Sequence, residues 1–298
     1  MNIVEKITQE LELKSWQTEA VIRLIDEGNT IPFIARYRKE ATGAMHDDVL
    51  RAFDERLRYL RNLEERKETI LASIEEQGKL TAALRKEIEE AETAVKLEDI
   101  YRPYKPKRRT RAMIARERGL EPLALYILSG QGKPAVPVEA EKYVDAEREV
   151  PDVKAAIQGA EDIMAETMSD SAALRAWIRR KSVQEGCIVS AARTKQQAAE
   201  HSVYDNYYEY SEPIRKIPGH RVLALNRGEK EKILSIRLEV PEEEILRFMA
   251  QKMGADQHPA TAAYIREACA DAYKRLIAPS IETEIRNDLT DRAEDGAI

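Results

Sequence analysis

The stretch from residue 47 to residue 76 constrains the fold most, because its large apolar side chains recur at heptad spacing. These side chains are Leu50, Phe53, Leu57, Leu60, Leu71 and Ile74. The spacing predicts one helix about 45 Å long. Glu64 and Lys67 interrupt the stripe in its middle, so we expect another partner to pack there.

A second apolar stripe begins after Gly78, which ends the long helix. It consists of Leu80, Leu84, Ile88, Ala91 and Val95. The very short connection forces the two helices into an antiparallel hairpin over residues 47–97. A leucine-rich stripe at helical spacing is core in most proteins, so we interpret this hairpin as scaffold rather than as a binding site.

The first forty residues predict short helices joined by tight turns. Apolar residues recur at helical spacing from Ile3 to Leu11, and a second helix begins at Ser15 and carries Trp16 and Val21 on its apolar stripe. Pro32 fits the first turn of a third helix. The outline is helix-turn-helix-like, but short helices of this kind more often simply pack together, so we favour packing over DNA binding.

Composition also favours a mainly α, multi-helical chain. Of its 298 residues, 34% are charged and only 12 are glycine. Cys187 and Cys269 are isolated, so no disulfide framework is expected and a reducing cytoplasm is the natural location. The chain has neither a signal peptide at its start nor an apolar run long enough for a membrane helix.

The loop-like composition of residues 130–137 marks a boundary between two predicted domains, 1–130 and 131–298. Helices resume near Pro151. A small β-hairpin is expected near residues 221–240, because apolar and polar residues alternate from Leu234 to Val240 after the apolar run that begins at Arg221. Four tyrosines between residues 204 and 210 have acidic neighbours, so we favour packing over base contact for them.

The segment from Tyr101 to Gly119 carries eight cations and one anion, in a chain whose net charge is -6. Charge this segregated indicates a polyanion partner or an acidic docking surface. Pro103 and Pro106 disfavour helix at the residues before them, so an extended backbone that can follow phosphates is expected. Tyr101 and Tyr104 add aromatic faces for stacking. The candidate nucleic-acid contacts are Lys105, Lys107, Arg108, Arg109 and Arg111, with Arg36, Arg38 and Lys39 as weaker candidates.

Nothing in the sequence indicates catalysis. The four histidines, His46, His201, His220 and His258, fall in unrelated contexts, and His220 is interpreted as structural at a strand end. No phosphate-binding glycine loop, metalloprotease motif or nucleophile elbow occurs. We therefore expect a protein that is not an enzyme and has no metal or cofactor.

Several long motifs, in order along nearly the whole chain, resemble the Tex family of bacterial transcription accessory proteins. They are Thr30–Gly43 (TIPFIARYRKEATG), Leu97–Thr110 (LEDIYRPYKPKRRT), Gly119–Ala124, Gly219–Gly228 and Asp271–Glu282. In that family, an N-terminal helical region precedes a ribonuclease-H-like domain, helix-hairpin-helix elements and an RNA-binding OB-fold domain. The sequence ends about where the ribonuclease-H-like domain is expected, so it resembles the N-terminal portion.

The resemblance implies a role in transcription through nucleic-acid binding, with RNA expected rather than DNA, and RNA polymerase or the transcription complex as a further partner. The alternative is a protein-interaction scaffold that docks RNA polymerase or downstream domains. In that case the cations pair with acidic helices of the same chain. Cations exposed on one face favour nucleic-acid binding, whereas cations paired with Asp and Glu favour the scaffold.

Overall fold

The computed structural model describes residues 2–199 and 201–295, and its packing divides the chain into two compact units, 1–105 and 106–298. Each unit has its own apolar core. Residues 111–128 contribute to the core of the second unit. Independent folding of residues 1–130 and 131–298 as two domains stays a prediction. No helix in the described ranges combines the length and apolarity needed to cross a membrane.

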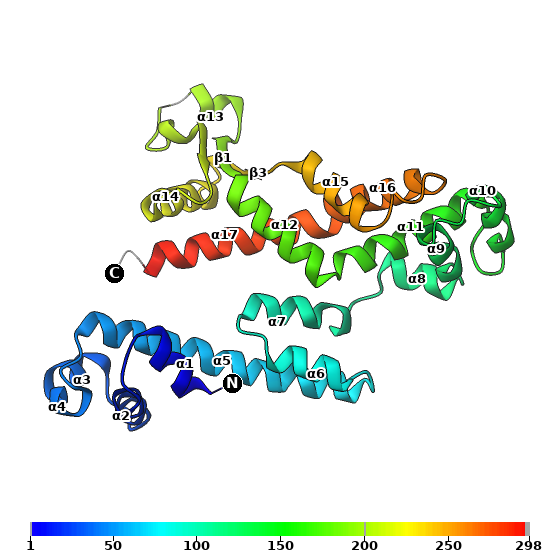
Figure 1. The fold of residues 1–298 in the computed structure, drawn as a ribbon. Helices are drawn as coiled ribbons and strands as arrows, with labels where there is room; N and C mark the ends of the chain where they lie inside the picture. The colour runs from blue at the N-terminus through cyan, green and yellow to red at the C-terminus, as the bar shows by residue number, and fades with distance from the viewer. Residues whose placement is uncertain (1, 200, 296–298) are drawn as a thin grey trace. The chain divides into compact units, whose positions relative to one another are not determined.

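The first unit begins with short helices that pack on the N-terminal half of a long one (Figure 1). They are α1 (Ile3–Glu10), α2 (Ser15–Asp26), α3 (Ile31–Tyr37) and α4 (Lys39–Thr42), and the long helix is α5 (Asp47–Glu76). Gly28 follows α2 with φ +85°, and the Thr30 hydroxyl caps α3 by accepting from the Phe33 amide. Ile7, Val21 and Ile34 are fully buried against α5, which confirms the interpretation of these helices as packed elements.

The long helix α5 has the bounds that the heptad spacing predicts, but the second arm of the hairpin is not one helix. It is divided into α6 (Ala82–Glu89) and α7 (Ala94–Tyr101). The division falls at Thr93, whose hydroxyl accepts from the Lys96 amide and so starts a new helix. Leu84 and Ile88 of α6 are buried in the core with α5, but Val95 is 44% exposed, and α7 contributes Leu97, Ile100 and Tyr101 to that core instead.

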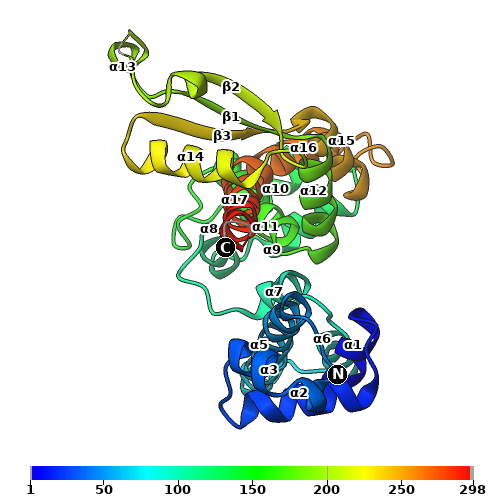
Figure 2. The same ribbon diagram turned by 90° about the vertical axis from the view of Figure 1, so that its left-hand side faces the viewer.

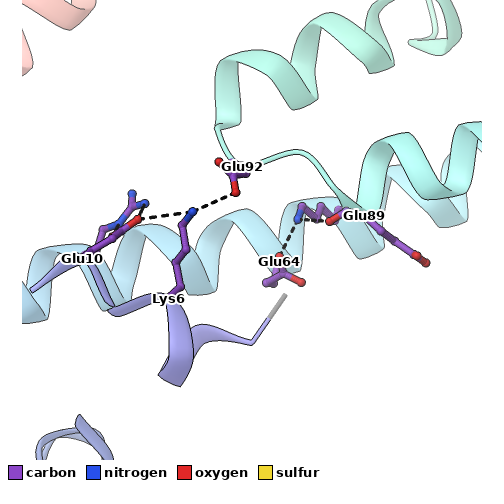
Figure 3. Close-up of polar contacts among 7 residues, drawn as sticks. Lys6, Glu10, Glu64, Glu89 and Glu92 are labelled. Carbon is purple, nitrogen blue, oxygen red and sulfur yellow. Dashed lines mark hydrogen bonds and ion pairs between the residues drawn. The ribbon is translucent and has the colours of Figure 1, made fainter. Parts of the chain in front are cut away.

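Glu64 and Lys67, which interrupt the heptad, form polar contacts within the first unit. The Lys67 side chain is 3% exposed, and its ammonium donates to Glu64 Oε1 and to the Glu89 carbonyl oxygen, both at 2.8 Å. Close by in Figure 3, Lys6 reaches Glu92 at 3.0 Å and Glu10 at 3.8 Å. A buried lysine is tolerated in the seam because its charge is paired and hydrogen-bonded.

The second unit is arranged around α11 (Val153–Ser169), which packs against helices on both sides of it in sequence. Its other helices outside the region of the sheet are α8 (Arg111–Glu117), α9 (Glu121–Leu128), α10 (Val136–Ala140), α12 (Ala172–Glu185), α15 (Glu242–Lys252), α16 (Ala262–Asp271) and α17 (Ala278–Asp295). Ser171 caps α12, because its hydroxyl accepts from the Leu174 amide. A π-helical segment, Ala272–Ile277, precedes α17, and the helix continues through Pro279.

The described residues form a small antiparallel sheet with strand order β2-β1-β3, rather than the expected hairpin. Its strands are β1 (Cys187–Ala192), β2 (Glu209–Pro213) and β3 (Leu234–Glu239), and α13 (Lys195–Ala199) lies between the first two in sequence. The prediction of β3 is confirmed. The prediction of a strand from Arg221 is wrong, because residues 219–230 form α14 (Gly219–Lys230) beside the sheet (Figure 2), so His220 lies in a helix.

The tyrosines at 204–210 pack against this sheet. Tyr204 is 3% exposed, and Tyr207, Tyr208 and Tyr210 line the same cluster with Ile188, Leu225 and Leu234. Tyr207 and Tyr210 form an edge-on ring pair with centroids 5.2 Å apart. The expectation of packing rather than base contact agrees with this burial.

Candidate nucleic-acid interface

The basic segment begins with a helical turn, not with the extended backbone that its prolines predict. Residues Arg102–Tyr104 form a 3-10 turn, and the backbone becomes extended only at Lys105. The proline rule is a steric preference, and here the turn continues directly from α7. Thr110 then caps α8, because its hydroxyl accepts from the Met113 amide at 3.1 Å.

The ring of Tyr101 is buried, so it is not available to stack on a base. Its ring is 7% exposed in the core formed by α5, α6 and α7. Its hydroxyl lies 3.0 Å from Ser73 Oγ, and the Arg66 guanidinium lies over its ring at 5.5 Å. Tyr104 packs, half-buried, against the same core. Because these faces contact protein, the expectation that they stack on bases is wrong for Tyr101 and has no support for Tyr104.

Four cations of the segment are paired with carboxylates of the second unit. These ion pairs are Lys107–Asp170 (2.5 Å), Arg109–Glu117 (2.8 Å), Arg116–Glu166 (2.8 Å) and Arg118–Glu149 (2.7 Å). Glu166 lies on α11 and Asp170 directly follows it, so two of the pairs fasten the segment and α8 to α11. The scaffold interpretation fits these cations.

The pKa values of the paired carboxyls reflect the same anchoring. Burial would raise the pKa of Glu166, but hydrogen bonds from Arg116 and Thr110 and the charge of Lys107 outweigh it, so the net shift is downward. A hydrogen bond from Arg118 lowers the pKa of Glu149 in the same way. These carboxylates therefore stay charged and hold their cations near neutral pH.

Lys105, Arg108 and Arg111 behave differently. All three are exposed, and none forms an ion pair with a residue in the ranges 2–199 or 201–295. Arg111 is the first residue of α8, where a cation opposes the positive end of the helix dipole, and its charge is near enough to the buried Asp162 of α11 to oppose the rise in the pKa of that carboxyl that burial causes. The segment thus combines anchored cations with solvent-facing ones.

The weaker candidates lie at the junction of α3 and α4. Arg36, Arg38 and Lys39 are exposed, and none of them pairs with a carboxylate in the described part of the chain. The Arg38 guanidinium lies 5.1 Å from the centroid of the Phe33 ring and donates to the Tyr37 carbonyl oxygen. Their charges are therefore directed to solvent and to aromatic faces.

Sequence reasoning missed two residues beside these cations. Trp16 was placed on the apolar stripe of α2, yet it is 49% exposed, and Tyr37 is 63% exposed. Buried Ala20, Val21 and Leu24 define the true inward face of α2. An aromatic residue in the first turn of a helix, ahead of the regular stripe, is the signal that could have identified Trp16.

Comparisons with known proteins agree with this fold. The family model described as "Tex-like protein N-terminal domain" matches residues 1–75, and "Tex central region-like" matches residues 133–298. Transcriptional accessory protein Tex of Neisseria gonorrhoeae is 40% identical over the full chain. Uncharacterized protein YdcI of Bacillus subtilis is 44% identical over 99% of it, and human S1 RNA-binding domain-containing protein 1 is 28% identical over all of it.

The mainly helical fold and these matches together define a class in which a Tex-like N-terminal domain is followed by a Tex-like central region. The chain belongs to the Tex family. It covers about 40% of the length of its bacterial relatives, namely 41% of the Bacillus protein and 40% of the Neisseria protein, and 31% of the human one.

Proposed function

We propose that this chain contributes a nucleic-acid contact to a cytoplasmic Tex-like transcription accessory protein, with RNA as the ligand and no catalysis of its own. The observation that carries the proposal is the exposure of Lys105, Arg108 and Arg111 without ion pairs in the described ranges, beside cations that the chain does neutralise. Unneutralised cations concentrated in one segment are what a phosphate backbone attracts.

The anchored cations support this role by fixing the segment. Lys107 is held by Asp170 and Arg116 by Glu166, so the chain between them is fastened at both ends. Arg108 and Arg111 lie between these two anchors. A fastened segment loses less conformational entropy on binding than a free one, and that favours affinity.

The second candidate function is a scaffold that docks RNA polymerase or downstream domains. The intrachain pairs of Lys107, Arg109, Arg116 and Arg118 favour it, because these cations already have protein partners. In this case Arg108 and Arg111 contact an acidic protein surface rather than phosphates, and the chain does not bind RNA.

Salt dependence of RNA binding separates the two functions. If the chain neutralises Z phosphates of single-stranded RNA, log affinity falls with log salt at a slope of about -0.7Z, so removing two contacts makes the slope shallower by about 1.4. We expect this change in the variant Arg108→Ala with Arg111→Ala. The control, Lys154→Ala with Arg193→Ala, removes the same charge at exposed positions of the second unit and keeps the wild-type slope.

Two results would contradict the proposal. One is an unchanged slope in the Arg108→Ala, Arg111→Ala variant. The other is the absence of RNA binding by the wild-type chain at low salt, which would favour the scaffold.

A further inference from the structure

Two large aromatic side chains of the first unit are exposed to solvent and are not part of its buried core. Trp16 and Tyr37 are 49% and 63% exposed. Such side chains ordinarily contribute large buried areas to a core or to an interface. The exposure of both in one small unit points to a ligand.

Local contacts place Trp16 at one end of α4. A Cβ atom on Gly43 would lie 2.9 Å from the Trp16 ring atom Cη2, so the indole lies directly against Gly43. The Gln17 amide also donates to the Thr42 carbonyl oxygen at 3.0 Å. Gly43 has φ +67° and ends α4, and both its conformation and the close indole favour glycine there.

The other end of α4 carries the cations. This helix has four residues, Lys39–Thr42, so its ends are separated by roughly one turn, about 6 Å. Arg38 precedes it and lies over the Phe33 ring, whose centroid is 5.2 Å from that of Tyr37. Trp16 therefore lies at the C-terminal end of α4, and Arg38, Phe33 and Tyr37 lie at its N-terminal end.

The charge of this surface is predominantly positive. Arg36, Arg38 and Lys39 are exposed and unpaired among residues 2–199 and 201–295. The exposed carboxylates nearest to them in sequence are Glu40 on α4 and Asp47 and Asp48 at the start of α5, of which Asp47 is paired with Arg51. We name this surface the aromatic-basic patch, defined as Trp16, Phe33, Arg36, Tyr37, Arg38 and Lys39.

We propose that the aromatic-basic patch binds single-stranded RNA, with bases stacked on Trp16 and Tyr37 and phosphates beside Arg36, Arg38 and Lys39. Aromatic faces next to cations are the shared chemistry of single-strand binding, because every base has a face to stack and every nucleotide carries a phosphate. A duplex hides its base faces, so it binds the patch more weakly. This inference rests on the proposed nucleic-acid role but uses a different surface from the basic segment.

The chain provides its own reporter for this site. It contains two tryptophans, and Trp177 is stacked on Phe248 at 3.7 Å in the second unit. In a Trp177→Phe variant, the remaining fluorescence comes from Trp16 alone. We expect saturable quenching by an oligouridine, and little quenching by an abasic strand of equal length or by a duplex.

Binding measured by fluorescence anisotropy completes the test. We expect Trp16→Ala to weaken oligouridine binding about tenfold, since one stacked base contributes on that order. Trp16→Phe keeps most of the affinity, which shows that loss of the fold is not the cause. Leu125→Ala, which removes an exposed apolar side chain elsewhere, leaves binding unchanged.

The outcomes distinguish this inference from the function on which it rests. If RNA binds with the expected dependence on Arg108 and Arg111 but neither quenches Trp16 nor responds to Trp16→Ala, the inference is wrong and the proposed function stands. Equal quenching by the abasic strand or by polyglutamate overturns base stacking in favour of a general acidic partner. If no RNA binds at low salt, both proposals fail.

Discussion

Arg175 on α12 and Glu284 on α17 form an ion pair in which the guanidinium is completely buried. Arg175 Nη2 lies 2.9 Å from Glu284 Oε1 and donates to Ser280 Oγ at 2.6 Å. The second carboxylate oxygen accepts from Arg179 at 2.7 Å. The Glu284 carboxylate therefore contacts two cations of α12.

Removal of this carboxylate should be strongly destabilising. Glu284→Ala removes a carboxylate that is hydrogen-bonded to a buried cation, and we expect the free energy of unfolding to fall by about 3–5 kcal/mol. Urea denaturation followed by circular dichroism measures the change. Glu282→Gln is the control on the same helix, with an expected effect within about 0.5 kcal/mol. Equal effects of the two variants would contradict the importance of the pair.

The stability of the second unit should decrease as pH rises toward neutrality, because of Glu161. The pKa of Glu161 is raised to about 7, chiefly by burial. Charge repulsion from Glu267, a hydrogen bond with the Glu267 carboxyl, and repulsion from Asp162 and Asp271 act in the same direction. The folded chain therefore holds a proton that the unfolded chain releases near its ordinary pKa of about 4.5. The free energy of unfolding then falls between about pH 4.5 and pH 7.

Glu161→Gln tests this dependence, because glutamine resembles the protonated acid at every pH. We expect the variant to be more stable than the wild type at pH 8 by about 1–3 kcal/mol, since one pKa unit corresponds to about 1.4 kcal/mol. The two should differ little at pH 4. Thermal unfolding across this range gives the comparison, with the exposed Glu147→Gln as the control. A wild-type slope in Glu161→Gln would show that another group is responsible.

Gly159 on α11 lies directly against Leu120. A Cβ atom at this position would lie 2.2 Å from Leu120 Cδ1. Alanine is the better helix former by about 1 kcal/mol, but here it overfills the core, so we expect Gly159→Ala to destabilise by about 1–3 kcal/mol. Adding Leu120→Val, which shortens the opposing side chain, should recover part of the loss. Additive effects in this double-mutant cycle would argue against the contact.

The two cysteines should differ in reactivity. Cys269 is 1% exposed on α16, and burial raises the pKa of its thiol to about 12, whereas Cys187 is half-buried at the start of β1. Thiolate is the reactive form, so iodoacetamide should modify Cys187 first in the native chain and both thiols after denaturation. Peptide mass spectrometry reports the order. Preferential labelling of Cys269 in the native chain would contradict its burial.

Local signals predicted the helices well, because apolar spacing and caps are contained in a few neighbouring residues. The bounds of α5 follow from its heptad stripe, and the start of α3 follows from Pro32. The sheet was mostly missed because β1 and β2 are short and their pairing is non-local. The apolar run after Arg221 suits a strand or a helix equally, and its packing beside the sheet selects the helix.

The sequence predicted which residues of the candidate site are cations, but not which of them are exposed and which are paired. Composition identified the cations, but it could not show that Lys107 is paired with Asp170 while Arg108 is not paired within the described ranges. The partner of Lys107 lies 63 residues away, and its position depends on the packing of α11. Exposure of Trp16 likewise depends on which face of α2 meets α5.

Mapping of RNA cross-links on the 298-residue chain tests the central claim most directly. A single-stranded RNA containing 4-thiouridine is bound at low salt, irradiated and digested, and the cross-linked peptides are identified by mass spectrometry. We predict cross-links within residues 105–111, and their loss in the Arg108→Ala, Arg111→Ala variant but not in the Lys154→Ala, Arg193→Ala control. Cross-links confined to other parts of the chain, or equally strong in both variants, would contradict a nucleic-acid contact at this segment.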